Sequence, residues 1–237
     1  MSKGGITYSI GQDPSIHRTF LSRTAESCSS YLLPHLTPSL ELLDVGCGPG
    51  SITADFAAIL SLGHVTGIDQ APEAIAKALS TAASRGLTNV SFQVADAVEL
   101  PFPDGEFDVV HAHHVLYHTQ DPVKALMEMK CVTKPGGLIA SRDGVMSTLT
   151  MYPLNPALSE WMAIIHKAMA SEGGDVDGGC KVQVWARKAG LKIEWQGASC
   201  IGAYTREDRI SMAGVLGEKS LGKRAVEMGL AMRPEFC

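Results

Sequence analysis

The sequence predicts an α/β fold in which a doubly wound, mostly parallel sheet is covered by helices on both faces. Short apolar runs alternate with helical patterns, a glycine-rich stretch follows the first run, and acidic residues stand at the ends of successive runs. Strands that are buried on both faces read as continuous apolar runs. With 237 residues, the chain is long enough for one such domain and its core.

Six short apolar runs are the expected strands. Turn signals precede two of them, namely Pro103-Asp104-Gly105 before the fourth and Lys134-Pro135-Gly136-Gly137 before the fifth. The expected strands are 40–45, 64–69, 90–94, 107–112, 138–143 and 191–200.

Helical spacing of apolar residues fills the intervals between these runs. A first helix is expected from Pro14 to Leu33, where Pro34 ends it, and Gly86 ends the helix after the second strand. The other expected helices are 52–60, 71–85, 122–132, 155–171, 182–189 and 206–228.

Composition limits the class of partner. The formal net charge is −5 and no stripe of Lys and Arg is present, which disfavours a nucleic-acid substrate. No apolar run reaches the ~18–20 residues that cross a bilayer, and the N-terminal residues lack the apolar core of a secretory signal. The six cysteines are scattered without a CxxC pair, so reduced thiols are expected rather than disulfides or a zinc site. The sequence therefore predicts a cytoplasmic protein without a nucleic-acid or membrane partner.

The strongest local signal is the stretch from Leu42 to Ile52, which reads LLDVGCGPGSI. A strand runs into a glycine loop and then into a helix, so that backbone without side chains can approach a ligand. The dinucleotide fingerprint G-x-G-x-x-G, counted from Gly46 through Gly48, needs a glycine where Ser51 stands. Asp44 would repel a pyrophosphate, but it would attract a cation at ~4 Å by on the order of 4 kcal/mol at an effective dielectric of ~20. The sign of the charge favours the sulfonium cofactor S-adenosylmethionine (SAM) over a nicotinamide dinucleotide.

Two further acidic residues end the next two strands. Asp69 follows Asp44 by 25 positions, and a carboxylate there can accept hydrogen bonds from both hydroxyls of a ribose. Asp96 follows the third strand and can accept a hydrogen bond from an adenine amino group. Each acid alone could be a solvated loop residue. The three in this order predict one cleft at the carboxyl edge of the sheet.

At these residues the chain resembles the class I SAM-dependent methyltransferases, whose domain is Rossmann-like. Residues 44–50 are similar to their first motif, 67–69 to their ribose-binding acid and 93–97 to their adenine motif. Residues 100–110 and 133–137 are similar to the ubiquinone/menaquinone-biosynthesis-like branch (methyltransferase domain 11/25 type), which acts mainly on small molecules. The resemblance covers about residues 5–200 and implies that the cofactor is lined by Gly46, Asp69, Gln70, Asp96, Ala97 and His113, with Tyr8 and Arg23 added from the N-terminal segment.

The resemblance also implies an organisation of the chain as a single domain over residues 1–237. Residues 1–38 are expected to form an N-terminal helical lid, 39–143 the cofactor-binding core, 144–180 a helical cap inserted between strands five and six, and 181–237 a C-terminal helix–strand–helix. The Met-rich insertion is either a packed helix or a cap that lines an apolar acceptor pocket, and both interpretations are compatible. The family ends on a seventh, antiparallel strand, whereas the nine residues after Met228 do not read as one. The sheet edge is therefore expected to be shortened or to be completed by a partner chain in a homodimer.

Histidines after the fourth strand are the candidates for acceptor chemistry. The stretch from His111 to His118 stands where nucleic-acid amino-methylating relatives carry a Pro-Pro-Tyr-type motif. His114 and His118 lie four apart, hence on one face if the segment is helical, and Asp143 ends the fifth strand. These three are the candidate general bases; capping or core roles, or catalysis by positioning alone, remain alternatives. His111 is expected to point into the core, and no metal site is expected because no carboxylate stands at useful spacing.

Three functions follow from these residues. The first is a SAM-dependent methyltransferase that acts on a small, hydrophobic organic acceptor. The second is a SAM-binding protein of the same fold that does not methylate, either a cyclase or a regulatory pseudoenzyme. The third, a nicotinamide-dependent oxidoreductase, is disfavoured by Asp44 and Ser51.

Overall fold

The computed structural model describes residues 23–150 and 156–199. Five parallel strands form one sheet in the order β3-β2-β1-β4-β5. The chain order reverses between β1 and β4, which is the switch point at which such sheets bind ligands. The strands are β1 (Glu41–Val45), β2 (His64–Asp69), β3 (Val90–Val94), β4 (Phe107–His113) and β5 (Thr133–Arg142).

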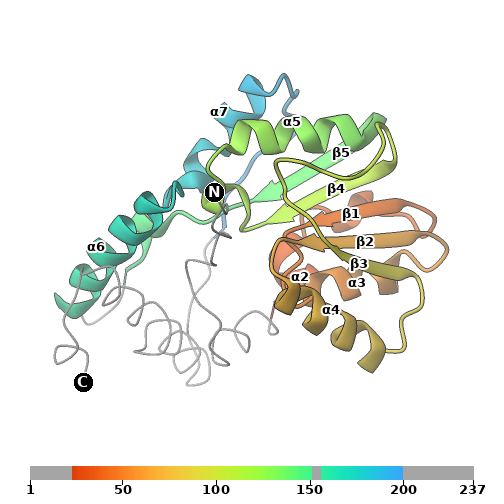
Figure 1. Cartoon of the computed structure of the whole chain (residues 1–237). Helices are drawn as coiled ribbons and strands as arrows, with labels where there is room; N and C mark the ends of the chain where they lie inside the picture. The colour runs from red at the N-terminus through yellow and green to blue at the C-terminus, as the bar shows by residue number, and fades with distance from the viewer. Residues whose placement is uncertain (1–22, 151–155, 200–237) are drawn as a thin grey trace, which may run out of the picture.

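Helices cover both faces of this sheet, as the sequence predicts. Figure 1 shows α2, α3 and α4 on one side and α5 and α7 on the other. The described helices are α2 (Ala25–Ser29), α3 (Ser51–Ile59), α4 (Pro72–Ser84), α5 (Pro122–Val132), α6 (Pro156–Ser171) and α7 (Gly178–Lys188), with short 3-10 turns η1 (Leu33–His35), η2 (Leu116–His118) and η3 (Met146–Thr148).

Local chemistry sets several helix starts. The Thr24 side chain accepts from Ser27 N and forms a capping box at α2, and Asp121 accepts from Lys124 N at α5. Pro72 and Pro122 occupy first-turn positions, where a missing N–H costs no hydrogen bond. Within the described part of the first expected helix, only Ala25–Ser29 is α-helical, and turns connect it to η1.

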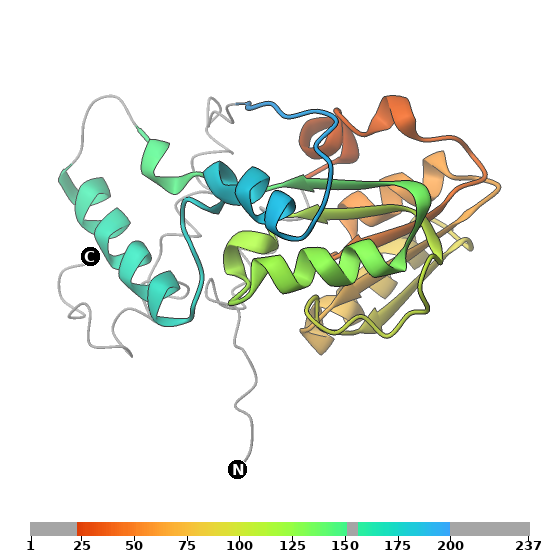
Figure 2. The ribbon, with the colours of Figure 1, turned by 90° about the horizontal axis from the view of Figure 1, so that it is seen from above.

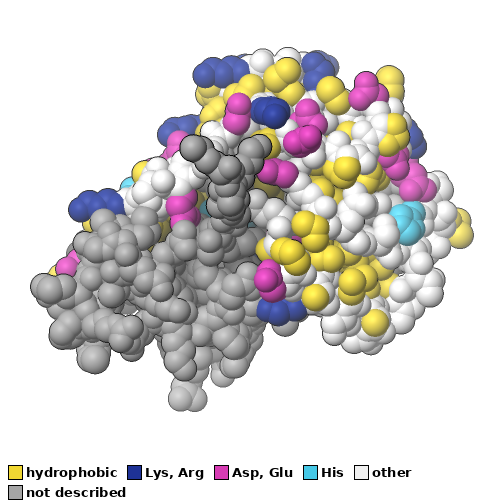
Figure 3. Space-filling view, in the orientation of Figure 1, with side chains coloured by type: hydrophobic (Ala, Val, Ile, Leu, Met, Phe, Trp, Pro, Cys, Tyr) yellow, Lys and Arg dark blue, Asp and Glu magenta, His cyan; other side chains and the backbone are white. Residues whose placement is uncertain are grey.

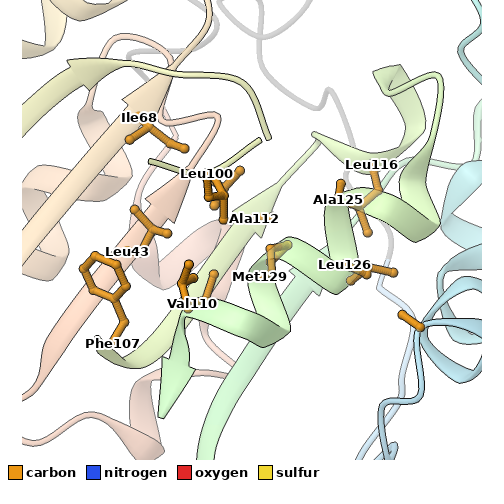
Figure 4. Close-up of a cluster of buried hydrophobic side chains, with 13 residues drawn as sticks. Leu43, Ile68, Leu100, Phe107, Val110, Ala112, Leu116, Ala125, Leu126 and Met129 are labelled. Atoms are coloured by element: carbon orange, nitrogen blue, oxygen red, sulfur yellow. The ribbon is translucent and has the colours of Figure 1, made fainter. Parts of the chain in front are cut away.

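The main core lies between the sheet and α5. Figure 4 shows Leu43, Val110 and Ala112 of the strands facing Leu126 and Met129 of α5. A second cluster packs α2 and α3 on the opposite face, where Phe56 is fully buried. Buried apolar side chains on both faces explain why the strands read as continuous apolar runs.

The helical insertion after β5 lies beyond the carboxyl end of that strand. Figures 1 and 2 both show α6 standing away from the sheet. Ile165 and Met169 of α6 pack with Val176 against Tyr117 of η2, and three partly buried side chains (Met146, Leu149 and Met162) complete this cluster. The insertion is thereby joined to the segment that follows β4.

Two sequence predictions about the strands are corrected. The sixth strand expected at 191–200 is absent over the described residues 191–199, which have no strand structure and are largely exposed. A segment with apolar–polar alternation forms a strand only if a neighbouring strand has unpaired backbone N–H and C=O groups to bond with it. This segment instead contacts the rest of the fold through side chains. Trp195 stacks on Tyr31 at 5.9 Å between ring centroids, and Arg142 Nη2 donates to Ser199 Oγ at 2.7 Å.

The second correction concerns the turn expected at 134–137. These residues lie inside β5, where the pairing with β4 shifts between Phe107 and Val109. The Pro-Gly-Gly sequence therefore makes a bulge within the strand, with Gly136 at φ +81°. The expected helix 206–228 lies outside the described residues.

Candidate cofactor cleft

A cleft opens at the carboxyl ends of β1 and β4, at the switch point of the sheet. Its walls come from Arg23, two residues before α2, from the ends of β1 and β4, from the β1–α3 loop, from the start of α3 and from the segment after β4. The residues that line it are Arg23, Asp44, Gly46, Cys47, Gly48, Pro49, Ser51, Ile52, His113, His114, Tyr117 and His118.

The glycine loop brings backbone to the wall of this cleft. Cys47 N donates to Ile68 O at 2.8 Å, which ties the loop to β2. Gly46 has φ +67° and Gly48 has φ +55°, a region that L side chains adopt at a cost. A Cβ on Gly46 would also overlap Val115 Cγ2, so the segment after β4 packs directly on this glycine. Glycine at position 46 is thus required by both backbone angle and packing.

Asp44 places a buried carboxylate in the cleft wall. Its side chain sits one strand away from His111, its partner in the β1–β4 register. Oδ1 accepts from His111 Nδ1 at 2.7 Å and Oδ2 accepts from Thr53 Oγ1 at 2.5 Å. The residue is only 3% exposed. Each carboxylate oxygen can accept more than one hydrogen bond, so both keep capacity for a ligand donor.

Asp69, at the end of β2, supports the glycine loop. Its Oδ2 accepts from Gly48 N at 3.0 Å and its Oδ1 accepts from Ala71 N at 2.9 Å. The residue is buried, and the following Gln70 is exposed. The bond to Gly48 joins Asp69 to a residue of the cleft wall, and its role as the ribose acid stays a prediction.

Asp96 and Ala97 lie two and three residues beyond β3. Asp96 is exposed and its Oδ1 accepts from Val98 N at 3.1 Å, whereas Ala97 packs against the main core cluster. Ala95 N donates to Asp69 O at 3.1 Å, which holds the ends of β2 and β3 together. The three acids therefore follow three neighbouring strands at one edge of the sheet. Of the three, Asp44 lines the cleft itself.

His113 is buried in the opposite wall with its polar atoms unused. Within the described part of the chain, neither ring nitrogen has a hydrogen-bond partner, although the residue is only 7% exposed. Its ring stacks on His114 at 4.3 Å between centroids. Burial, and next the neighbouring His114, lower the pKa of His113 far below its usual value, so the ring is neutral. Two unsatisfied nitrogens in a cleft wall point to a ligand that supplies hydrogen bonds.

His114 and His118 both line the cleft, but not as neighbours on an α-helix. His114 has φ +58°, a strained angle for a residue with a side chain, and its N–H donates to Arg142 O at 2.9 Å. His118 ends the 3-10 turn η2. Burial and then Arg23 lower the pKa of His114 well below its usual value and that of His118 to about 4. Both rings are neutral near pH 7 and can accept a hydrogen bond.

Asp143 packs against η2 and is not one of the residues that line the cleft. Its Oδ1 accepts from Tyr117 N at 3.2 Å and its Oδ2 from Ser141 Oγ at 3.0 Å. Burial raises its pKa to about 6, against the lowering effect of these hydrogen bonds. The carboxylate thus supports the turn that carries Tyr117 and His118.

Asp143 should make stability fall as the pH rises, because the folded chain binds its proton more tightly than the unfolded chain does. Its contribution is fully present below the unfolded pKa of 3.8 and is lost as the pH rises through about 6. Relative to Asp143→Asn, we expect the free energy of unfolding of the wild type to fall by up to ~1.4 kcal/mol per pH unit in this window. Urea unfolding at several pH values measures it. The variant keeps the buried histidines, whose lowered pKa values act in the opposite direction, so their effects cancel. A difference that stays flat with pH would contradict the role of Asp143.

Some lining residues escaped the sequence analysis. Tyr117 and Cys47 line the cleft and Thr53 bonds Asp44, yet none was a candidate. The sequence did contain a signal for Thr53, which is a polar residue among the apolar residues of the first turn after the glycine loop and could have been expected to bond a buried polar group. Arg23 lines the cleft as expected, while Tyr8 lies outside the described residues. Within residues 23–150 and 156–199, no group of three or more His, Cys, Asp or Glu residues could hold a metal ion.

A methyltransferase domain model matches residues 36–196, about two thirds of the chain. The chain belongs to the methyltransferase domain family. This confirms the resemblance to class I SAM-dependent methyltransferases of the small-molecule type. The matched residues contain the five strands and most of the cleft wall.

Named relatives agree with this family. An uncharacterized methyltransferase of Schizosaccharomyces pombe is 40% identical over 154 residues, which are 62% of this chain and 55% of the relative. A ubiquinone/menaquinone biosynthesis C-methyltransferase of Bdellovibrio bacteriovorus is 37% identical over 99 residues, 42% of each chain. The chain spans about half the length of the curated relatives it matches.

Solved structures show the same fold. The YcgJ protein of Bacillus subtilis superposes with a TM-score of 0.62 at 22% identity, over 92% of this chain and 86% of that one. A SAM-dependent methyltransferase of Aquifex aeolicus gives a TM-score of 0.52 at 22% identity, over 68% of this chain and 88% of that one. The Rossmann-like α/β prediction is confirmed.

The cofactor of this methyltransferase family is SAM, and the cleft residues fit it. SAM carries a sulfonium and an ammonium group, and the buried Asp44 carboxylate offers the matching charge. The glycine loop leaves room for close approach of a ligand. The nitrogens of His113, which have no hydrogen-bond partner among the described residues, offer further polar contacts.

Proposed function

We propose that this chain binds SAM in the cleft and transfers its methyl group to a small, hydrophobic organic acceptor. The observation that carries the proposal is the buried Asp44 carboxylate at the switch point, held beside the glycine loop and open to the cleft. A buried carboxylate in this position attracts a cation and repels a pyrophosphate. Asp69, Gln70, Asp96 and Ala97 are proposed to bind the nucleoside part.

SAM supplies a methyl group activated by the positive charge on its sulfur. The chain's own residues supply position and surroundings for the acceptor. Tyr117 lines the cleft and also packs in the apolar cluster of α6. The side of the cleft near η2 is therefore lined by aromatic rings, those of Tyr117 and of His113, His114 and His118, with the apolar cluster behind Tyr117. An apolar acceptor is favoured there, because burial of its surface excludes water from the reacting atoms.

Neutral histidines suit an acceptor that loses a proton. His118 has a pKa of about 4, so its neutral ring accepts a hydrogen bond from a hydroxyl, thiol or amine and orients it. A base with so low a pKa is only weakly able to remove the acceptor's proton, so loss of that proton depends mainly on the acidity of the acceptor itself. Of the three candidate bases, His114 and His118 can touch an acceptor in the cleft, while Asp143 acts through η2.

Relatives support a small-molecule acceptor without deciding the atom. Their names include an N-methyltransferase for ajmaline from Rauvolfia serpentina, the C-methyltransferase for ubiquinone/menaquinone biosynthesis and an O-methyltransferase from Penicillium expansum. On the face shown in Figure 3, Lys and Arg side chains are dispersed among acidic ones, without the basic patch that tracks a phosphate backbone. The described structure contains no helix with the length and apolarity of a membrane span. Four cysteines in the described residues are free thiols, which suits the cytoplasmic location that we propose.

The test is transfer of a labelled methyl group. Calorimetric titration with SAM and with NAD comes first, and binding of NAD without SAM would overturn the proposal. The chain is then incubated with methyl-labelled SAM and a panel of apolar phenols, thiols, amines and enolisable carbon acids. We expect label on at least one class. SAM binding without transfer to any class would favour a SAM-binding protein that does not methylate.

A further inference from the structure

A buried chain of hydrogen bonds runs from the Asp44 carboxylate in the cleft wall to helix α2. Thr53 Oγ1 donates to Asp44 Oδ2 at 2.5 Å, and Asp44 Oδ1 lies 2.7 Å from His111 Nδ1. On the other side of the imidazole, His111 Nε2 lies 2.8 Å from Ser29 Oγ. The chain therefore connects α3, β1, β4 and α2 through side chains alone.

This network is sealed from water. His111 and Ser29 are both 0% exposed. The Phe56 ring meets the imidazole edge to face at 4.9 Å between centroids, which restricts rotation of the His111 ring. Because a carboxylate only accepts, the Nδ1 of His111 is the donor to Asp44. With Nδ1 as donor in the neutral tautomer, Nε2 accepts the proton of the Ser29 hydroxyl.

The order Ser–His–Asp matches that of a hydrolase triad, but the burial rules out that chemistry. Ser29 is enclosed between α2 and the sheet, so its hydroxyl cannot reach a substrate. Only the Asp44 end of the network lines the cleft. The function of the other members is therefore exerted through Asp44.

α2 is itself held at the edge of the cleft. Ala25 N donates to Asp55 Oδ2 at 2.8 Å, and Arg142 Nη1 donates to Cys28 O at 3.0 Å. Figure 1 shows α2 beside α3, and Arg23, two residues before α2, lines the cleft. The Ser29–His111 bond is thus the contact through which this helix meets the carboxylate of the site.

We propose that His111 is a positioning residue of the cofactor site, which aims the Asp44 carboxylate into the cleft and anchors it to α2 through Ser29. The inference rests on the proposed function, because it assumes that the cleft binds SAM. Without the Nδ1 donor, the carboxylate is free to turn toward Thr53 and away from the cleft, and the unpaired buried charge loses its support. A histidine that only filled core volume would be replaceable by an apolar residue without loss of affinity.

The test compares three substitutions of His111 by calorimetric titration with SAM and by thermal unfolding. His111→Asn places an amide N–H near the position of Nδ1 and keeps a donor to Asp44. His111→Gln places its amide near Nε2 and keeps only the contact to Ser29, while His111→Leu removes both. We expect His111→Leu and His111→Gln to raise the dissociation constant for SAM by about 10- to 30-fold, and His111→Asn to restore it to within about threefold of the wild type. Ser29→Ala, which leaves the Asp44 bond in place, should have a smaller effect than His111→Gln.

The possible results distinguish failure of this inference from failure of the proposed function. Wild-type affinity in His111→Leu would overturn the inference, as would equal affinities of the Asn and Gln variants at equal melting temperatures. If His111→Leu does not fold, the Asn–Gln pair still decides the matter, because both variants keep a polar amide side chain and differ in which ring nitrogen the amide replaces. Failure of the wild-type chain to bind SAM would overturn the proposed function, and with it the inference; unchanged affinity in the variants would overturn the inference alone.

Discussion

Asp44→Asn is expected to weaken SAM binding by about 10- to 100-fold, since charge-assisted hydrogen bonds are worth more than neutral ones. The substitution keeps the size and shape of the side chain but removes the negative charge from the cleft wall. It also replaces one oxygen that accepts from His111 or Thr53 by an amide that cannot accept. Calorimetric titration with SAM measures the loss, and thermal unfolding shows whether the fold is kept.

Asp108→Asn is the matched control for this prediction. Asp108 accepts from Glu41 N at 2.9 Å and pairs with Lys134 at 2.9 Å, at the amino end of the strands, opposite the cleft. Both variants change the net charge by one, so a loss of affinity confined to Asp44→Asn reports local charge. Equal affinities in the two variants would remove the main support for a cationic cofactor.

Gly46→Ala is expected to lower the free energy of unfolding by about 2–5 kcal/mol. Alanine at φ +67° carries a backbone penalty of about 1–2 kcal/mol, and its Cβ would overlap Val115 Cγ2, adding about 1–3 kcal/mol of overpacking. For a chain of this size such a loss corresponds to a fall in melting temperature of roughly 4–20 °C. SAM affinity should fall as well, because Gly46 lines the cleft.

Two variants separate the contributions to this loss. Gly48→Ala has a similar backbone angle, φ +55°, but apart from its chain neighbours no atom of the described residues lies within 4 Å of its Cβ, so it should show the backbone penalty alone. Adding Val115→Ala to Gly46→Ala removes the overlapping methyl. The double variant should therefore lose less stability than the sum of the losses of the two single variants. Equal losses from Gly46→Ala and Gly48→Ala would show that Val115 yields without cost.

Sequence patterns were sufficient where the controlling interactions are local. The strands 64–69 and 90–94 were predicted with the bounds that the structure has, because short apolar runs flanked by turn residues leave few alternatives. The helix from Pro122 to Val132 was predicted equally well, since Asp121 and Pro122 mark its start chemically. The loop from Gly46 to Gly50 and the position of Asp44 in the cleft wall also followed from the sequence.

Predictions that depended on a distant partner were less successful. Residues 191–199 alternate like a strand but form none, because pairing depends on a neighbouring ladder and not on the segment itself. His114 and His118 were placed on one face on the condition that the segment is helical. In the structure a strained backbone at His114 and a 3-10 turn bring both to the cleft instead. Asp143 was proposed as a general base because it stands at the end of an expected strand. Its hydrogen-bond donor Tyr117 N belongs to η2, so this contact depends on how η2 packs against the end of β5.

The sequence by itself determined the Rossmann-like sheet and the negative charge of the cleft wall, since these depend on apolar periodicity, glycine spacing and acids at strand ends, and its resemblance to known methyltransferases indicated the family. Only the tertiary structure decided that Val115 packs on Gly46 and that His111 joins Asp44 to Ser29, 82 positions away in the chain. Contacts of this kind depend on strand order and register, which place β4 beside β1. Burial, which lowers the pKa values of His113, His114 and His118 and raises that of Asp143, is likewise a property of the assembled fold.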